Sequence, residues 1–277
     1  MSLAVDWARG HHALMAVLVV KMLLAPVFVV GVSVAVQRLG QRIGGILAGI
    51  PVVAGPILLV YVQQHGRTFA AHAAGGTLLG ILSLSCFVLV YARLASRVRW
   101  LWCVLAGWAV FLLATLALDH VSIAAGLALV LVGATLTVGL WLLPREPRGA
   151  SVAPIQLSWR NLLLRASCAL ALVIALAIAS GQLGPRMSGL LTPFPVITTV
   201  LAAFTHAQRG GAAPTPLFSG MLWGFFGFAI FCFALTISLR GLGTVAGFAL
   251  ATVAMLITQA VVISLRVAVS MLPRSPE

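Results

Sequence analysis

Apolar runs of about 20 residues recur along the whole chain, and they restrict the fold more than any other feature. A run of that length, wound as an α-helix, crosses the hydrocarbon core of a membrane. Hydrophobic residues make up 62% of the 277 residues and charged residues only 8%. So few polar groups cannot cover a soluble domain of this size, and the alternation typical of a transmembrane barrel is absent. We therefore expect an all-α polytopic membrane protein.

The apolar runs predict about nine transmembrane helices, whose boundaries are approximate. The predicted spans are 12–37, 43–63, 69–92, 99–118, 121–143, 160–182, 187–207, 216–239 and 243–267.

Positive charges are distributed unevenly when the loops are assigned alternately to the two sides of the membrane. One side holds eleven arginines, namely Arg38, Arg42, Arg93, Arg97, Arg99, Arg145, Arg148, Arg160, Arg209, Arg266 and Arg274. The other side holds four, namely Arg9, Arg67, Arg186 and Arg240. Cytoplasmic loops carry the excess of Lys and Arg, so we predict a cytoplasmic C-terminus and an N-terminus on the opposite side. The net charge of +13 thus follows from orientation, and we expect no nucleic-acid partner.

The chain matches itself without gaps when it is shifted by 144 residues. The segment LGQRIGGILAGIPVVAGPIL lies over LGPRMSGLLTPFPVITTVLA, which aligns Gly45 with Gly189 and Pro51 with Pro195. Matching glycines and prolines in one register are much less probable by chance than matching leucines. We therefore interpret the two halves as copies of one duplicated unit.

The duplication predicts three parts of the chain: repeat 1 at 1–118, a spacer span with a cytoplasmic linker at 119–159, and repeat 2 at 160–277. Each repeat contains four spans, and its second span is broken by Gly and Pro. Since one spacer span separates them, the second repeat begins on the opposite side of the membrane. The repeats are therefore expected to be inverted, as in many secondary transporters.

Each repeat resembles the GlpM family of small four-span bacterial inner-membrane proteins. The matching pieces in repeat 2 are Arg165, GLLTPFP at Gly189–Pro195 and QRG at Gln208–Gly210. In repeat 1, GILAGIP at Gly45–Pro51 keeps the glycine and the final proline but lacks the Phe. The resemblance implies two fused GlpM-like units in a bacterial inner membrane. Together with the orientation predicted from the loop charges, this location would put the N-terminus in the periplasm. It implies no activity that carries over.

The second and seventh spans contain the residues least suited to a helix interior, because Pro lacks an N–H and Gly has a low helix propensity. Backbone groups freed by a break need partners, since lipid offers none. We predict that substrate binds between the two broken spans; a kinked helix packed closely on a neighbour is the alternative. The candidate residues are Gly45, Gly49, Pro51, Gly55 and Pro56 in one span, and Gly189, Thr192, Pro193, Pro195, Thr198 and Thr199 in the other.

Two cations lie inside apolar runs, where an ionised side chain is costly unless it faces a partner or water. Lys21 and Arg165 occupy matching positions of the repeats, and we predict that they attract an anionic substrate. Snorkelling to the membrane surface is the alternative for Arg165. Arg42 and Arg186 begin the broken segments, where they either guide and gate the anion or anchor the helices at the headgroups.

The sequence has no P-loop, no G-x-S-x-G, no metal-ligand cluster and no paired carboxylates, so we expect neither an enzyme nor a cofactor or metal site. The leading hypothesis is a secondary transporter or flippase for an organic anion or an anionic lipid headgroup. The alternative is a scaffold or accessory subunit of an envelope polysaccharide or lipid pathway. A passive anion channel is a third hypothesis. The lipid bilayer is the expected partner, and the sequence leaves a homo-oligomer open.

Overall fold

The computed structural model describes residues 24–144, 158–179 and 185–271. Every element in these ranges is a helix, which confirms the expected all-α class for this part of the chain. The helices are Leu24–Leu39, α2 (Gln41–Ala48), α3 (Ala54–Leu94), α4 (Trp100–Asp119), α5 (Ala125–Leu142), α6 (Trp159–Ala179), α7 (Pro185–Leu191), α8 (Val196–Arg209), α9 (Thr215–Ser238) and α10 (Thr244–Met271).

Six helical segments in the described ranges are long and apolar enough to cross a membrane. They are Ala54–Leu94, Trp100–Asp119, Ala125–Leu142, Met187–Arg209, Thr215–Ser238 and Thr244–Leu265. The 20 residues of α4 measure about 30 Å, which equals the thickness of the hydrocarbon core. The architecture is that of a multi-pass membrane protein.

The count of nine spans stays a prediction, for reasons that differ between the segments. The expected span 12–37 begins outside the described residues, which contain only its later part in Leu24–Leu39. The expected span 43–63 is divided between α2 and the beginning of α3. The expected span 160–182 corresponds to α6, which ends where the described residues stop.

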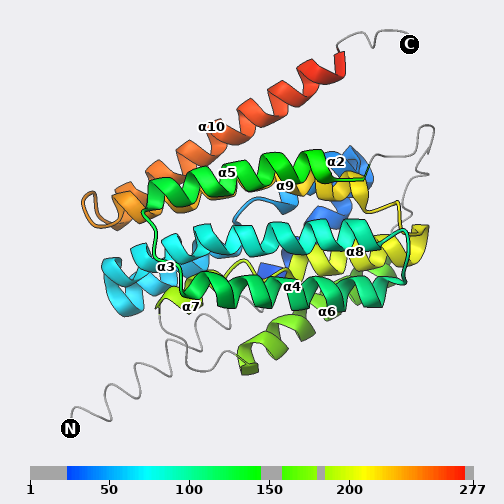
Figure 1. Cartoon of the computed structure of the whole chain (residues 1–277), viewed down its shortest axis with the longest axis horizontal. Helices are drawn as coiled ribbons and strands as arrows, with labels where there is room; N and C mark the ends of the chain where they lie inside the picture. The colour runs from blue at the N-terminus through cyan, green and yellow to red at the C-terminus, as the bar shows by residue number, and fades with distance from the viewer. Residues whose placement is uncertain (1–23, 145–157, 180–184, 272–277) are drawn as a thin grey trace.

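Two helices form the centre of the structure, and others cover them. α9 packs against α2, α10, α3 and α5, while α3 also packs against α7 and α4. Figure 1 shows α3, α4 and α5 running side by side, with α10 leaving the bundle at an angle. Most of α3 and α9 is buried, whereas α4, α5 and α10 expose most of their apolar side chains. Such an apolar outer surface suits contact with lipid rather than water.

Gly66 divides the 41 residues of α3 into two helices, since its backbone angles (φ 84°, ψ 169°) are not helical. A straight helix of this length would measure about 60 Å, twice the thickness of the hydrocarbon core. Gly210, which follows α8, has almost the same angles (φ 86°, ψ 173°). Both conformations lie at positive φ, which glycine adopts without the steric cost that a Cβ brings.

Candidate functional site

The two sequences that were expected to break their helices do so. α2 ends at Ala48 and α3 begins at Ala54, while α7 ends at Leu191 and α8 begins at Val196. The first interruption contains Pro51 and the second contains Pro193 and Pro195, and proline cannot donate a backbone hydrogen bond.

The two breaks share one set of backbone hydrogen bonds, related by the offset of 144 residues. In the first, the N–H groups of Ile50, Val52 and Gly55 donate to the carbonyl oxygens of Leu47, Ile50 and Pro51 at 3.1, 2.8 and 2.9 Å. In the second, the matching donors are the N–H groups of Phe194, Val196 and Thr199, and the acceptors are those of Leu191, Phe194 and Pro195, at 3.0, 2.7 and 2.8 Å. The bond from Val52 to Ile50 spans Pro51 and the bond from Val196 to Phe194 spans Pro195, and each closes a γ-turn. The breaks are therefore ordered turns that satisfy much of their own backbone.

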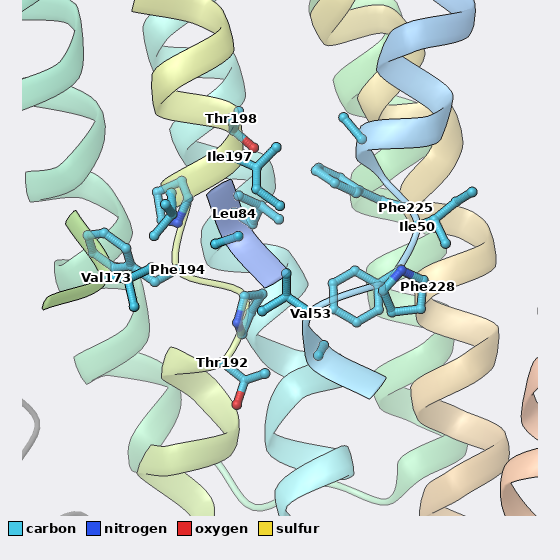
Figure 2. A pocket seen from close by; sticks show the side chains of 17 residues that line it. Ile50, Val53, Leu84, Val173, Thr192, Phe194, Ile197, Thr198, Phe225 and Phe228 are labelled. Atoms are coloured by element: carbon cyan, nitrogen blue, oxygen red, sulfur yellow. The ribbon is translucent and has the colours of Figure 1, made fainter. Parts of the chain in front are cut away.

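A cavity of about 80 Å³ lies between the two breaks. Figure 2 shows Ile50 and Val53 on one side of it and Thr192 and Phe194 on the other. Since about 10–15 Å³ accommodates one water molecule by this measure, the cavity has room for a few waters or a small group of a larger ligand. It is the place at which the two halves of the chain bring their broken helices together.

The walls of the cavity are mainly apolar. Of the predicted residues, Pro51, Thr192, Pro193, Pro195 and Thr198 line it. The rest of the wall consists of apolar residues of the breaks, such as Ile50 and Phe194, and of apolar side chains on other helices. Nothing in the sequence distinguishes these side chains from ordinary core residues. Those on other helices include Leu84 on α3, Val173 on α6, and Phe225 and Phe228 on α9.

Hydroxyl groups gather beside the second break. Thr192 donates from Oγ1 to the carbonyl oxygen of Ser188 at 2.7 Å, and the side chain of Tyr61 is hydrogen-bonded to Ser188 and Thr192. Thr199 accepts a bond of 3.0 Å from Nε1 of Trp108. These contacts hold α8 and the break in place, and nothing in the sequence distinguishes Tyr61 or Trp108 as contacts of the break.

The predicted glycines serve close helix packing. An added Cβ on Gly45 would collide with the carbonyl oxygen of Leu217, and one on Gly189 would collide with that of Ala73. A Cβ on Gly49 would lie 2.7 Å from Cα of Gly224, far inside an ordinary contact of about 3.5–4.0 Å. Small residues thus let α2 approach α9 and let α7 approach α3, as the packing alternative predicted.

Gly55 and Pro56 lie in the first turn of α3 and do not line the cavity. A Cβ on Gly55 would meet the ring of Phe231 at an ordinary distance of 3.5 Å. These two positions therefore shape the start of the helix.

Arg165 is 1% exposed, so it is buried inside the protein. Its Nη1 donates to Oγ of Ser33 at 3.4 Å and its Nη2 to Oε1 of Gln208 at 3.5 Å, while Nε has no hydrogen-bond partner among the described residues. Both bonds exceed the usual length of about 2.7–3.2 Å. The guanidinium also lies 5.0 Å from the ring centre of Phe204, a cation–π distance.

Arg165 and the cavity occupy different levels of α6. Val173, which lines the cavity, is eight residues further along the helix, which corresponds to about 12 Å. Five of the predicted residues therefore line the cavity, whereas Arg165 lies about two helical turns away from it along α6.

Arg42, one of the two predicted gating residues, does not line the cavity. Arg42 lines a separate open hollow together with Trp141 and Ser219. Arg186 belongs to α7, but its side chain lies outside the described residues, as does Lys21. The pairing of Lys21 with Arg165 therefore stays a prediction.

No family model, curated protein or solved structure matches the chain. The resemblance of each half to the GlpM family therefore stays a prediction as well.

Proposed function

We propose that this protein is a secondary transporter or flippase for amphiphilic organic anions, and that the cavity between the two broken helices takes part in binding. One observation carries the proposal: Pro51 and Pro195, which are 144 residues apart, both line the same cavity. Broken helices that meet near the middle of the membrane are typical of secondary transporters.

We also propose that the halves are inverted repeats of four spans each, joined by α5. Reciprocal packing supports this: Gly45 of the first half packs on Leu217 of the second, and Gly189 of the second packs on Ala73 of the first. Since 217 minus 73 and 189 minus 45 both equal 144, each contact is the exchange of the other. Such exchange is what a two-fold axis produces.

The chemistry around the cavity favours an amphiphile over a small hydrophilic anion. The cavity walls are mainly apolar, which suits a hydrocarbon part of the substrate. Arg165 lies about 12 Å away along α6, without a strong hydrogen bond in the described residues. A substrate that carries an anionic group on an apolar body would satisfy both environments. We propose that the protein spans a bacterial inner membrane, with its C-terminus in the cytoplasm.

The proposal is tested with the full chain in proteoliposomes. The probes are fluorescently labelled phosphatidylglycerol, whose transbilayer movement is followed by dithionite quenching, and decanesulfonate, whose efflux is measured directly. We expect faster movement of at least one probe than in protein-free liposomes. Ala54→Leu fills the cavity wall and should remove most of that acceleration, whereas Ala109→Leu adds the same bulk to an exposed face of α4. An inactive wild-type chain, or an Ala54→Leu variant as fast as wild type, contradicts the proposal.

The inverted arrangement has its own test. In a chain whose four native cysteines are replaced by serine, a cysteine is introduced at Arg42 or at Arg186. The inverted repeat predicts that a membrane-impermeant thiol reagent reaches these two positions from opposite sides of the membrane. Labelling of both from the same side would eliminate the inversion.

The scaffold remains the second candidate, because the apolar cavity walls also suit a packed and inactive core. The two candidates differ in whether water reaches the cavity. Cysteine introduced at Ala54 reacts with a water-soluble methanethiosulfonate in a transporter that opens, whereas it stays unmodified in a permanently packed scaffold.

A further inference from the structure

An apolar groove of about 600 Å³ lies on the outer face of the helices α4, α6 and α8. Its walls are Trp100, Val104 and Trp108 on α4 and Cys168 and Leu172 on α6, and residues of α8 such as Phe204 form part of it. From Trp100 to Trp108 the groove extends for about 12 Å along α4. The lining of the groove is almost entirely apolar. Such a groove, on a bundle whose outer helices face lipid, suits a hydrocarbon chain.

Several arginines gather at one end of this groove. α4 runs antiparallel to α8, because Trp108 contacts Thr199 while Trp100 and Ala207 both line the groove. The same end therefore contains Arg99, which precedes α4, and Arg209, which ends α8.

Arg165 adds a buried cation to this end of the groove. It contacts Phe204, a groove residue, through its guanidinium, and it lies close enough to Arg209 for the two charges to repel. Its Nε is buried, and the part of the chain that the structure describes offers it no hydrogen-bond partner. Three arginines are therefore gathered at this end of the groove.

At this end of the groove no carboxylate is found within the described ranges. Asp119 is the single carboxylate of those ranges, and it ends α4, 19 residues beyond Trp100, which corresponds to about 28 Å. Arg99 is exposed and Arg209 is partly exposed, so a headgroup can approach them from the membrane surface. Basic pockets between transmembrane helices bind anionic lipid headgroups for this reason.

We propose that the groove binds one anionic phospholipid, with an acyl chain between α4 and α6 and the phosphate at Arg99 and Arg209. Arg165 adds its buried charge to the field at the phosphate. The groove is separate from the cavity at the two breaks, since α8 and Phe194 lie between Trp108 and that cavity. The proposal therefore holds whether or not the protein transports a substrate.

The test uses the delipidated full chain in detergent and native mass spectrometry. The probes are dioleoylphosphatidylglycerol and dioleoylphosphatidylcholine, added at equal concentrations. We expect one phosphatidylglycerol to bind more tightly than phosphatidylcholine. Cys168→Trp or Leu172→Trp should abolish that binding, because the new ring occupies the groove. Val253→Trp adds the same bulk to an exposed position of α10 and should leave the binding unchanged.

Charge variants test the headgroup contact separately. Arg99→Gln and Arg209→Gln should each weaken phosphatidylglycerol binding about five-fold, the effect of one cation near a phosphate. Arg240→Gln is the matched control, because this exposed arginine lies beside His72 and outside the groove. Inorganic phosphate should not replace the lipid in occupying the site.

Three results would overturn the proposal: wild-type binding of both lipids with equal affinity, unchanged binding in the tryptophan variants, or a phosphate site that persists in those variants. A measurement on the unaltered chain covers the case in which a variant does not fold. The exposed thiol of Cys168 lines the groove, so N-ethylmaleimide should label it more slowly in phosphatidylglycerol nanodiscs than in phosphatidylcholine nanodiscs. Equal rates would contradict an anionic lipid in the groove.

Discussion

Adding one methyl group at Gly45 or Gly189 should destabilise the protein through the same physical contact in each half. A Cβ on Gly45 would lie 2.9 Å from both Cα of Gly220 and N of Met221, besides colliding with a carbonyl oxygen. A Cβ on Gly189 would lie 3.0 Å from Cα and the carbonyl carbon of Ala73. Ordinary contacts are about 3.5–4.0 Å, so the helices would have to separate by about 0.5 Å or more.

The neighbouring atoms belong to backbone, which cannot rotate away as a side chain can. Overpacking of this kind costs about 1–3 kcal/mol, and each kcal/mol lowers the melting temperature of a chain this large by about 2–4 °C. The gain of about 1 kcal/mol in helix propensity offsets part of this cost, so we expect Gly45→Ala and Gly189→Ala to melt about 2–8 °C below wild type, for a net cost of about 1–2 kcal/mol. Tryptophan fluorescence during heating in detergent measures this at one fixed scan rate.

Gly133→Ala is the matched control, because a Cβ on this glycine of α5 meets nothing within 4 Å. Ala has a higher helix propensity by about 1 kcal/mol, so this variant should melt at or above the wild-type temperature. Melting temperatures of Gly45→Ala and Gly189→Ala equal to that of Gly133→Ala would refute the close packing. A large effect at one position alone would contradict the equivalence of the halves.

Three further predictions concern single contacts. Gly66→Ala and Gly210→Ala should each cost about 1–3 kcal/mol in unfolding free energy, since these glycines combine positive φ with ψ of 169° and 173°, a region that is essentially restricted to glycine, and the new Cβ meets nothing else; thermal melts check this, and unequal shifts would count against matching turns. Arg165→Met should not lower the melting temperature by more than about 2 °C, because the removed charge is buried with an unpaired Nε; a larger fall in the same melts would reveal a structural role for the charge. Trp108→Phe should cost about 1 kcal/mol through the lost bond to Thr199, and the double variant with Thr199→Val should cost little more; additive melting shifts would disprove the coupling.

Sequence periodicity and composition were enough to predict an all-α membrane protein and the places where two helices break. Pro and Gly act locally: Pro51 and Pro195 lack the N–H that the interior of a helix requires. The offset of 144 residues was also visible in the sequence, and the hydrogen bonds of both breaks follow that offset. The positions of the two helix breaks therefore follow from the residues of each segment alone.

Tertiary structure decided which of the candidate residues share a site. The glycines proposed for substrate binding pack against other helices instead. Arg165 and the cavity differ by about two turns of α6, a separation that follows from helix register. Phe225 and Phe228, which form an aromatic part of the cavity wall, come from α9. This helix belongs to neither of the two broken segments.

By itself, then, the sequence determined the class of protein and the position of its two helix breaks, because hydrophobicity and proline act within one segment. Only the tertiary structure decided that the breaks face one another across a small apolar cavity, and that a groove between α4, α6 and α8 ends at arginines. The reason is physical: a cavity or groove is the space left between helices, and that space depends on how their side chains pack.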